Sequence, residues 1–110
     1  MTKSEVQSMA FLMIAYAGSA FDHFYKAIEY ARHAEFEASD AEMKQGIEEL
    51  NNAHRSQSEL LSAEVNDEDI PFSIIMTHAQ DHLSMAIFSQ RTANEFIYLY
   101  KEREERKHEG

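Results

Sequence analysis

Residues 70–100 read IPFSIIMTHAQDHLSMAIFSQRTANEFIYLY and set the expected fold. Mostly apolar residues recur there in steps of four and three, the spacing of one face of an α-helix. One stripe consists of Ile74, His78, Asp81, Met85, Phe88, Thr92, Glu95 and Leu99. A second stripe beside it consists of Ile75, Ala79, His82, Ala86, Ala93, Phe96 and Tyr100. Two adjacent stripes exceed what the last helix of a lone bundle needs, so we expect one to pack within the subunit and the other between identical subunits.

Two further helices are expected upstream of this stretch. The first should begin near Ser4, where Ser4 and Gln7 match a capping box, and should stop within residues 32–36. Its apolar face would consist of Val6, Met9, Met13, Ala17, Ala20, Phe24, Ala27 and Ala31. The second should begin at Ser39 or Asp40, either of which is a good N-cap residue. Its inward face would consist of Met43, Ile47, Leu50, His54, Gln57 and Leu61.

The ends of the third helix are marked by proline and by charge. Pro71 suits the first turn of a helix, so we expect this helix to start at about Ile70. After Tyr100 comes a run of alternating charges without an apolar stripe. We therefore expect residues 101–110 to be a charged tail that frays in solvent.

Composition limits the classes to which the protein can belong. The chain has 110 residues with 3 Gly, 1 Pro and no Cys, which argues against an all-β fold rich in turns and excludes disulfides and thiolate nucleophiles. We expect a single all-α domain over residues 1–110, folded as an antiparallel three-helix bundle. With 20 acidic and 10 basic residues the net charge is −10, which disfavours nucleic acid and anionic lipid as partners. The chain has neither a transmembrane run nor a signal-peptide pattern, so we expect no membrane insertion and a cytoplasmic protein.

The chemistry is expected where charge is scarce. Between residues 70 and 94 the only acid is Asp81 and the only base is Arg91. A carboxylate on a mainly apolar seam must be paired, protonated or bound to a metal. His78 and His82 flank it on the same side of the helix, with Cβ atoms about 5–6 Å apart.

Three interpretations compete for this group of side chains. The first is a buried polar layer that fixes helix register. The second is a metal site, because histidines four residues apart can ligate zinc, although one helix offers few further ligands. The third is nucleophilic catalysis by a neutral imidazole whose neighbours fix its tautomer. Because the chain has no glycine-rich phosphate loop, a histidine that accepts phosphate would take it from a partner protein.

The string HAQDHL at residues 78–83 is also the hallmark of a known family. With Ala17-Gly18, Phe36, Ala53-His54, Gln57 and Leu99-Tyr100 at the matching places, the chain resembles the lactose/cellobiose-specific enzyme IIA family of the bacterial sugar phosphotransferase system. The chain departs from the usual family pattern at Phe21, Ser84, Ala34 and Asn66. Ala34 and Asn66 stand near positions where the family often has glycine.

The resemblance implies a fold, an activity and partners. It implies a homotrimer of three-helix subunits in which His78 is the phosphorylated nucleophile, accepting phosphate from the phosphocarrier protein HPr and passing it to a IIB component. The uptake of a lactose-, cellobiose- or chitobiose-type sugar would follow. By the same resemblance, Asp81 of three subunits shares a divalent metal, Mg²⁺, on the trimer axis, while His82 and Gln80 support His78. The alternative is a non-catalytic trimeric interaction or regulatory protein with a structural His/Asp metal site.

Overall fold

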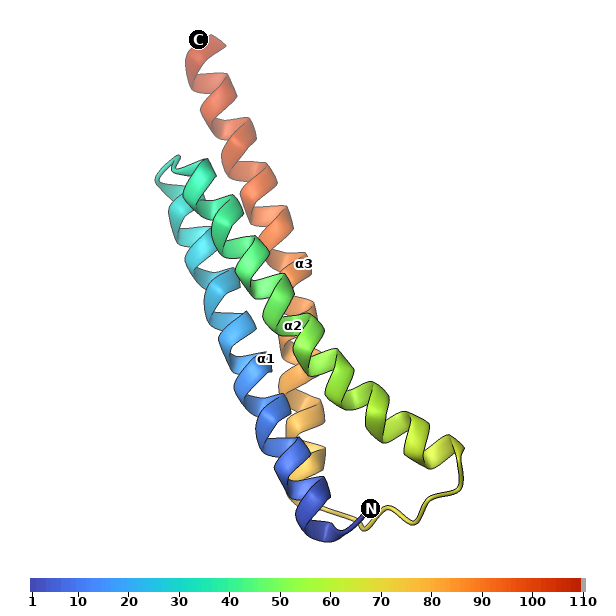
Figure 1. Ribbon diagram of the computed structural model, residues 1–110. Helices are drawn as coiled ribbons and strands as arrows, with labels where there is room; N and C mark the ends of the chain where they lie inside the picture. The colour runs from blue at the N-terminus through green and yellow to red at the C-terminus, as the bar shows by residue number, and fades with distance from the viewer. Residues whose placement is uncertain (110) are drawn as a thin grey trace.

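The computed structural model describes residues 1–109 and consists of three long helices (Figure 1). These are α1 (Lys3–Arg32), α2 (Phe36–Val65) and α3 (Ile74–Glu109). Helices α1 and α3 run in the same direction and α2 runs in the opposite direction. No strand occurs within residues 1–109, so the predicted all-α antiparallel three-helix bundle is confirmed. The molecule is a rod, with principal extents of 63 × 20 × 19 Å.

The core lies along the inward face of α1. Its buried residues are Val6, Ala10, Met13, Ala17, Ala20, Phe24, Ala27 and Ala31. Seven of these eight were expected from periodicity, and the difference is that Ala10 is buried while Met9 is only half-buried. Most of these side chains are small, so the two neighbouring helices can approach α1 closely.

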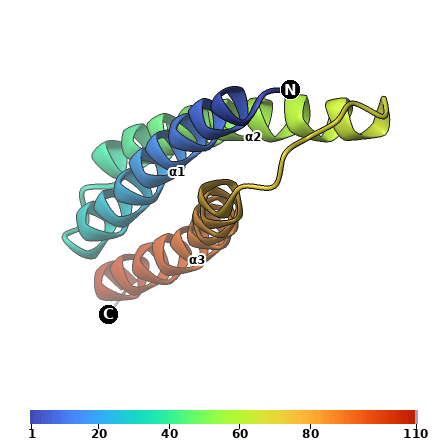
Figure 2. The same ribbon diagram turned by 90° about the horizontal axis from the view of Figure 1, so that it is seen from below.

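Helix α2 packs on α1 mainly through its first half. Gly46 is buried there because the Phe24 ring lies against it, and a Cβ atom at position 46 would be 2.5 Å from Phe24 Cε1. Ile47 and Leu61, which we expected to face inward, are 37% and 50% exposed. The prediction for these two residues is wrong, because the residues that are buried in their place are the preceding ones, Gly46 and Leu60. Towards its end α2 leaves the other two helices, as both views show (Figures 1 and 2).

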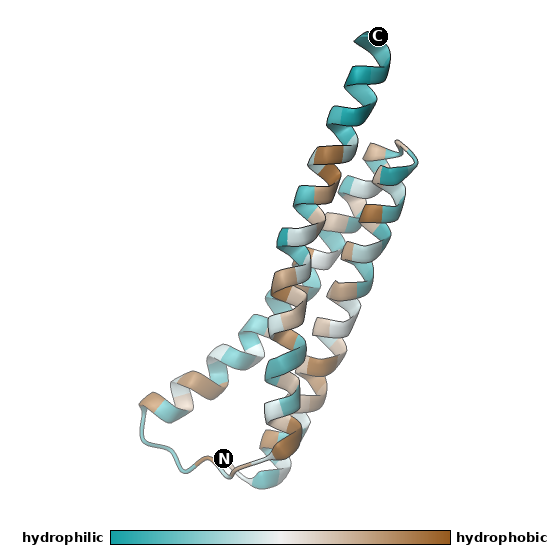
Figure 3. Ribbon diagram, turned by 180° about the vertical axis from the view of Figure 1, so that it is seen from behind, coloured by the Kyte–Doolittle hydropathy of each residue, from teal (hydrophilic) through white to brown (hydrophobic). Residues whose placement is uncertain are grey.

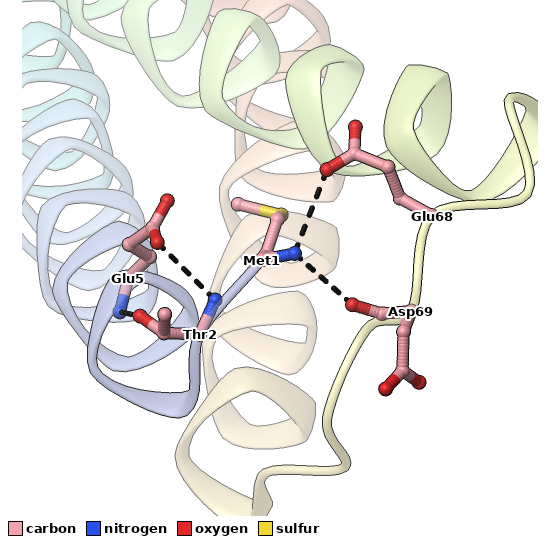
Figure 4. Close-up of polar contacts among 5 residues, drawn as sticks. All are labelled: Met1, Thr2, Glu5, Glu68 and Asp69. Carbon is pink, nitrogen blue, oxygen red and sulfur yellow. Dashed lines mark hydrogen bonds and ion pairs between the residues drawn. The ribbon is translucent and has the colours of Figure 1, made fainter.

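Helix α1 begins at Lys3, close to the predicted start near Ser4, but its N-cap lies two residues before the predicted one. Thr2 is the N-cap, and its hydroxyl accepts a hydrogen bond from Glu5 N at 3.1 Å while Glu5 Oε1 accepts one from Thr2 N at 3.2 Å (Figure 4). The capping box is therefore Thr2/Glu5 and not Ser4/Gln7. The hydrogen bonds from the Thr2 backbone and hydroxyl hold the pKa of Glu5 below its ordinary value.

Helix α2 begins at Phe36, three residues before the predicted start at Ser39. The connection from α1 is a tight turn in which Ala34 adopts a φ of 60°. The N-cap residue of α2 is Glu35, whose side chain makes no capping hydrogen bond. Ser39 does not cap the helix. It is fully buried, and its hydroxyl donates to Ala27 O at 2.8 Å, which joins α2 to α1.

Helix α3 begins at Ile74, four residues after the predicted start, so Pro71 belongs to the connection and not to the first turn. At its other end α3 continues as a helix through Glu109, whereas we expected the charged residues to fray; Gly110 lies outside the described residues. Arg103 donates to Arg32 O at 2.8 Å, and Arg106 pairs with Glu102 at 3.5 Å. Figure 3 shows these last turns to be hydrophilic, so they project into solvent as a charged helix.

Candidate functional site

The residues of the HAQDHL string occupy the second and third turns of α3, and the packing of that helix decides where each one points. Ala79 and Leu83 are 0% and 1% exposed and anchor the helix in the core. His78 and Asp81 lie on the opposite, exposed side, and His82 is half-buried between the two sides. The string therefore combines an anchor with a polar group that a partner protein can reach.

His78 and His82 meet directly on the surface of α3. Their Nε2 atoms are 3.1 Å apart, and the two rings are perpendicular, with centroids separated by 4.5 Å. A neutral imidazole carries one N–H, so in this pair one Nε2 donates a hydrogen bond and the other accepts it. Each ring thus fixes the tautomer of the other. The pair can supply a nucleophilic nitrogen next to a hydrogen-bond donor.

Gln80 points to the other side of the helix. Its Oε1 accepts a hydrogen bond of 2.8 Å from Gln57 Nε2 on α2, because residues two apart in a helix do not share a face. Gln80 therefore does not meet His78 within one subunit. Gln57, which holds Gln80, was expected only on the inward face of α2 and as part of the family pattern, and this contact was not predicted.

Asp81 is exposed one turn after His78, with Ile74 and Met85 among its exposed apolar neighbours along the stripe. Within residues 1–109 no three His, Cys, Asp or Glu side chains converge as a metal site. A single carboxylate offers a hard oxygen ligand but is too little to hold a divalent ion alone. The donor set therefore fits a metal only if several copies of Asp81 come together.

The first α3 stripe is exposed along much of its length. Large apolar side chains on it remain open to solvent, with exposed fractions of 77% for Ile74, 54% for Met85 and 71% for Phe88. By contrast Ala79, Ala86 and Ala93 of the second stripe are buried. The second stripe thus packs within the subunit through its alanines, although its Phe96 is 43% exposed, and the large apolar residues of the first stripe remain open to solvent.

Comparison with known proteins matches this arrangement to a family. The sequence model described as the lactose/cellobiose-specific IIA subunit of the PTS system matches residues 8–101. The chain belongs to this family. It is 37% identical over 101 residues to the lactose-specific EIIA component of Staphylococcus epidermidis, covering 92% of this chain and 97% of that protein. The corresponding protein of Lactococcus lactis subsp. lactis is 32% identical, with 92% and 96% covered.

Solved structures of IIA proteins have the same fold. The cellobiose-specific enzyme IIA from Bacillus anthracis superimposes with a TM-score of 0.88 at 35% identity, covering 94% of each chain. PtcA from S. mutans gives the same TM-score at 32% identity, with 92% of this chain and 99% of that chain covered. The family predicted from HAQDHL is confirmed.

Membership fixes the general role of the IIA chain. It is a component of a sugar phosphotransferase system and has a phosphotransferase role, with HPr and a IIB protein as the general partners of such a component. None of the three helices, over residues 1–109, combines the length and apolarity that crossing a membrane requires.

Proposed function

We propose that this IIA chain is a phosphoryl carrier that accepts phosphate from phospho-HPr on His78 Nε2 and passes it to a IIB component. The observation that carries the proposal is the exposed pair of imidazoles with facing Nε2 atoms, 3.1 Å apart. A carrier of this kind needs a nucleophile that two different proteins can reach, and His78 is exposed. The phosphate would drive the uptake of a lactose-, cellobiose- or chitobiose-type sugar, and the chain would work in the cytoplasm.

The proposed transfer uses the two rings in different roles. The lone pair of His78 Nε2 attacks phosphorus, and the bond that holds the phosphoryl group on HPr breaks as the new N–P bond forms. His78 then keeps its proton on Nδ1, because Nε2 is occupied. His82 Nε2–H, which faced the nucleophile, becomes a donor to a phosphoryl oxygen. Delivery to the IIB component reverses these steps: a nucleophile on that component attacks phosphorus, and the N–P bond of His78 breaks as the new bond forms.

The exposed α3 stripe supports assembly into a homotrimer. Ile74, Met85 and Phe88 form an uncovered apolar surface, and monomeric proteins rarely leave such surfaces open. An apolar groove of about 300 Å³ lies beside Phe88, between α3 and the aromatic residues Phe21 and Tyr25 of α1. A neighbouring copy that packs along the stripe would cover both features.

A trimer around α3 would bring the three Asp81 carboxylates together. Their mutual repulsion in an apolar seam would be large, and a hard dication such as Mg²⁺, when bound there, neutralises it. Asp81 would hold that ion through its carboxylate oxygens. Gln80, which lies on the opposite face of α3 from His78, would support a phosphohistidine only across a subunit boundary.

A phosphorylation assay tests the carrier function. Incubation with phosphoenolpyruvate, the first enzyme of the relay and HPr should load one acid-labile phosphate per chain, and an added IIB component should remove it. The His78→Gln variant should take up no phosphate. The control variant His54→Gln, which changes a half-buried histidine of α2, should take up one phosphate per chain. Equal loading of His78→Gln would refute the assignment. A loaded chain that never transfers phosphate to a IIB component would instead indicate a regulatory protein.

A further inference from the structure

The facing Nε2 atoms of His78 and His82 have the spacing of two ligands on one metal ion. A zinc–imidazole bond is about 2.0–2.1 Å long, so two nitrogens on a tetrahedral Zn²⁺ lie about 3.3 Å apart. In this chain the two Nε2 atoms are 3.1 Å apart, close to that separation. Small rotations of the two rings would bring both lone pairs onto a common point.

The ligand chemistry favours an ion different from the one proposed for Asp81. Imidazole nitrogen suits Zn²⁺, Cu²⁺ and Ni²⁺, whereas Mg²⁺ takes oxygen ligands. The pair is also accessible, because His78 is exposed and His82 is half-buried. The net charge of −10 raises the local concentration of cations around the chain.

We propose that His78 and His82 chelate a divalent transition-metal ion of the zinc class, which takes the place of the hydrogen bond between the two rings. The ring that donated this bond moves its proton from Nε2 to Nδ1, so both Nε2 lone pairs face the ion. Two protein ligands leave the remaining coordination positions to water, so the site is open and the ion exchanges. Within residues 1–109 no third His, Cys, Asp or Glu completes the set, which distinguishes this site from a closed structural zinc site.

Metal binding has a consequence for phosphoryl transfer, and this second step rests on the proposed function. The ion occupies the lone pair of His78 Nε2 that would attack phosphorus. A chain that holds the ion therefore cannot accept phosphate, and a phosphorylated chain cannot hold the ion. The pair would act as a reversible block on sugar phosphorylation when zinc-class ions are abundant.

Zinc titration against a competing chromophoric chelator tests the site on the whole chain. One Zn²⁺ per chain should bind, and ¹⁵N spectra of the imidazoles should show the Nε2 signals of His78 and His82 shifting together. His82→Gln and His78→Gln should each weaken binding by about tenfold or more, since each removes one of two imidazole ligands. His54→Gln, which leaves both ligands in place, should bind as the unaltered chain does. Unchanged affinity in His82→Gln, or shifts confined to one of the two rings, would overturn the proposal.

A second measurement separates this site from the carrier function. The phosphorylated chain should bind zinc no better than His78→Gln does. If the chain takes up no phosphate but still binds zinc through both rings, the metal site stands and the proposed function falls. If it takes up phosphate and binds no zinc through the pair, the metal site falls alone.

Discussion

In the proposed transfer the two histidines of the site have different roles, although their rings share one hydrogen bond. His78 is exposed and can meet a partner protein, whereas His82 is half-buried and its Nε2 faces that of His78. Removing His78 should abolish phosphoryl uptake, because no nucleophile is left. Removing His82 should leave the nucleophile but take away the donor that stabilises the phosphoryl oxygens.

The first prediction follows from this difference. His82→Ala should slow phosphoryl uptake from phospho-HPr by about 100-fold, the effect of losing one donor to a developing anion. His82→Gln, whose amide N–H can still donate, should recover part of that loss. Rapid-quench measurement of the first turnover checks both rates. Uptake by His82→Ala at the rate of the unaltered chain would exclude a supporting role.

A second prediction at this scale concerns Ala34. Its φ of 60° lies in the left-handed region, where steric strain from the Cβ atom costs about 1–2 kcal/mol. Glycine has no Cβ atom and adopts this region without that strain. Ala34→Gly should raise the free energy of unfolding by about 0.5–1 kcal/mol, after allowing for the greater freedom of glycine in the unfolded chain. Urea unfolding measures the change.

The matched control is Ala41→Gly, at an exposed position inside α2. There glycine has no strain to relieve, so it should lower the free energy of unfolding by about 1 kcal/mol. If both glycine variants lose stability, the turn at Ala34 does not carry the strain assigned to it.

Residue types and spacing were enough to select His78, Asp81 and His82, because all three belong to one helix whose period relates them. Gln57 was not selected as part of the site, since its contact with Gln80 joins two helices and no spacing along the chain encodes it. The same holds for the hydrogen bond between His23 Nδ1 of α1 and Glu42 Oε2 of α2, whose atoms are 2.6 Å apart. Contacts within a helix can be read from sequence, whereas contacts between helices depend on how the helices pack.

At the scale of helices, the contact of α1 with α2 depends on one glycine. A Cβ atom at position 46 would lie 2.5 Å from Phe24 Cε1, and Phe24 is 1% exposed, so neither side has room to move. Gly46→Ala should therefore lower the free energy of unfolding by about 1–3 kcal/mol, the usual cost of overpacking a core. Thermal or urea unfolding followed by circular dichroism measures it.

Gly18 of α1 serves as the control for this prediction. A Cβ atom there meets nothing within 4 Å in the same chain, and alanine favours a helix over glycine by about 1 kcal/mol. Gly18→Ala should not destabilise the fold of the chain. Equal losses in the two variants would mean that the close approach of Phe24 to Gly46 is not what limits position 46.

The buried face of α1 could be predicted, but the inward face of α2 was wrong at Ile47 and Leu61, and the starts of the helices could not be predicted. Apolar periodicity placed the buried face of α1 because it extends over eight turns, and one misplaced residue changes little. The start of a helix depends on one or two residues. Thr2 and not Ser4 caps α1, and α2 follows the turn at Ala34 without a side-chain cap. Pro71 is also compatible with an extended segment, so it could not fix the start of α3 at Ile74.

At the scale of the whole molecule, the uncovered α3 stripe predicts that chains associate, and the assembly we propose is a trimer. Light scattering should give the mass of three chains, and Phe88→Glu should shift it towards one chain because a carboxylate would be buried in the seam. Phe88 is 71% exposed in a single chain, so the change should leave the subunit folded. Val65→Glu, at a position 83% exposed at the end of α2, should keep three chains.

The role of Asp81 is tested with the same measurement. Asp81→Leu should keep the trimer, or make it tighter, because three leucines in the seam need no cation. The unaltered chain should lose assembly when a chelator of divalent ions is added, and Asp81→Leu should not. Monomers in Asp81→Leu would place Asp81 away from the axis.

The central claim is that His78, and not its partner ring, carries the phosphoryl group. The most direct measurement is ³¹P and ¹⁵N NMR of the chain after loading through HPr, with each imidazole nitrogen assigned. We predict one phosphorus per chain, bonded to Nε2 of His78, with His82 unphosphorylated and its N–H signal shifted by the nearby phosphoryl group. Phosphorus bonded to His82, or loading that persists in His78→Gln, would contradict the account.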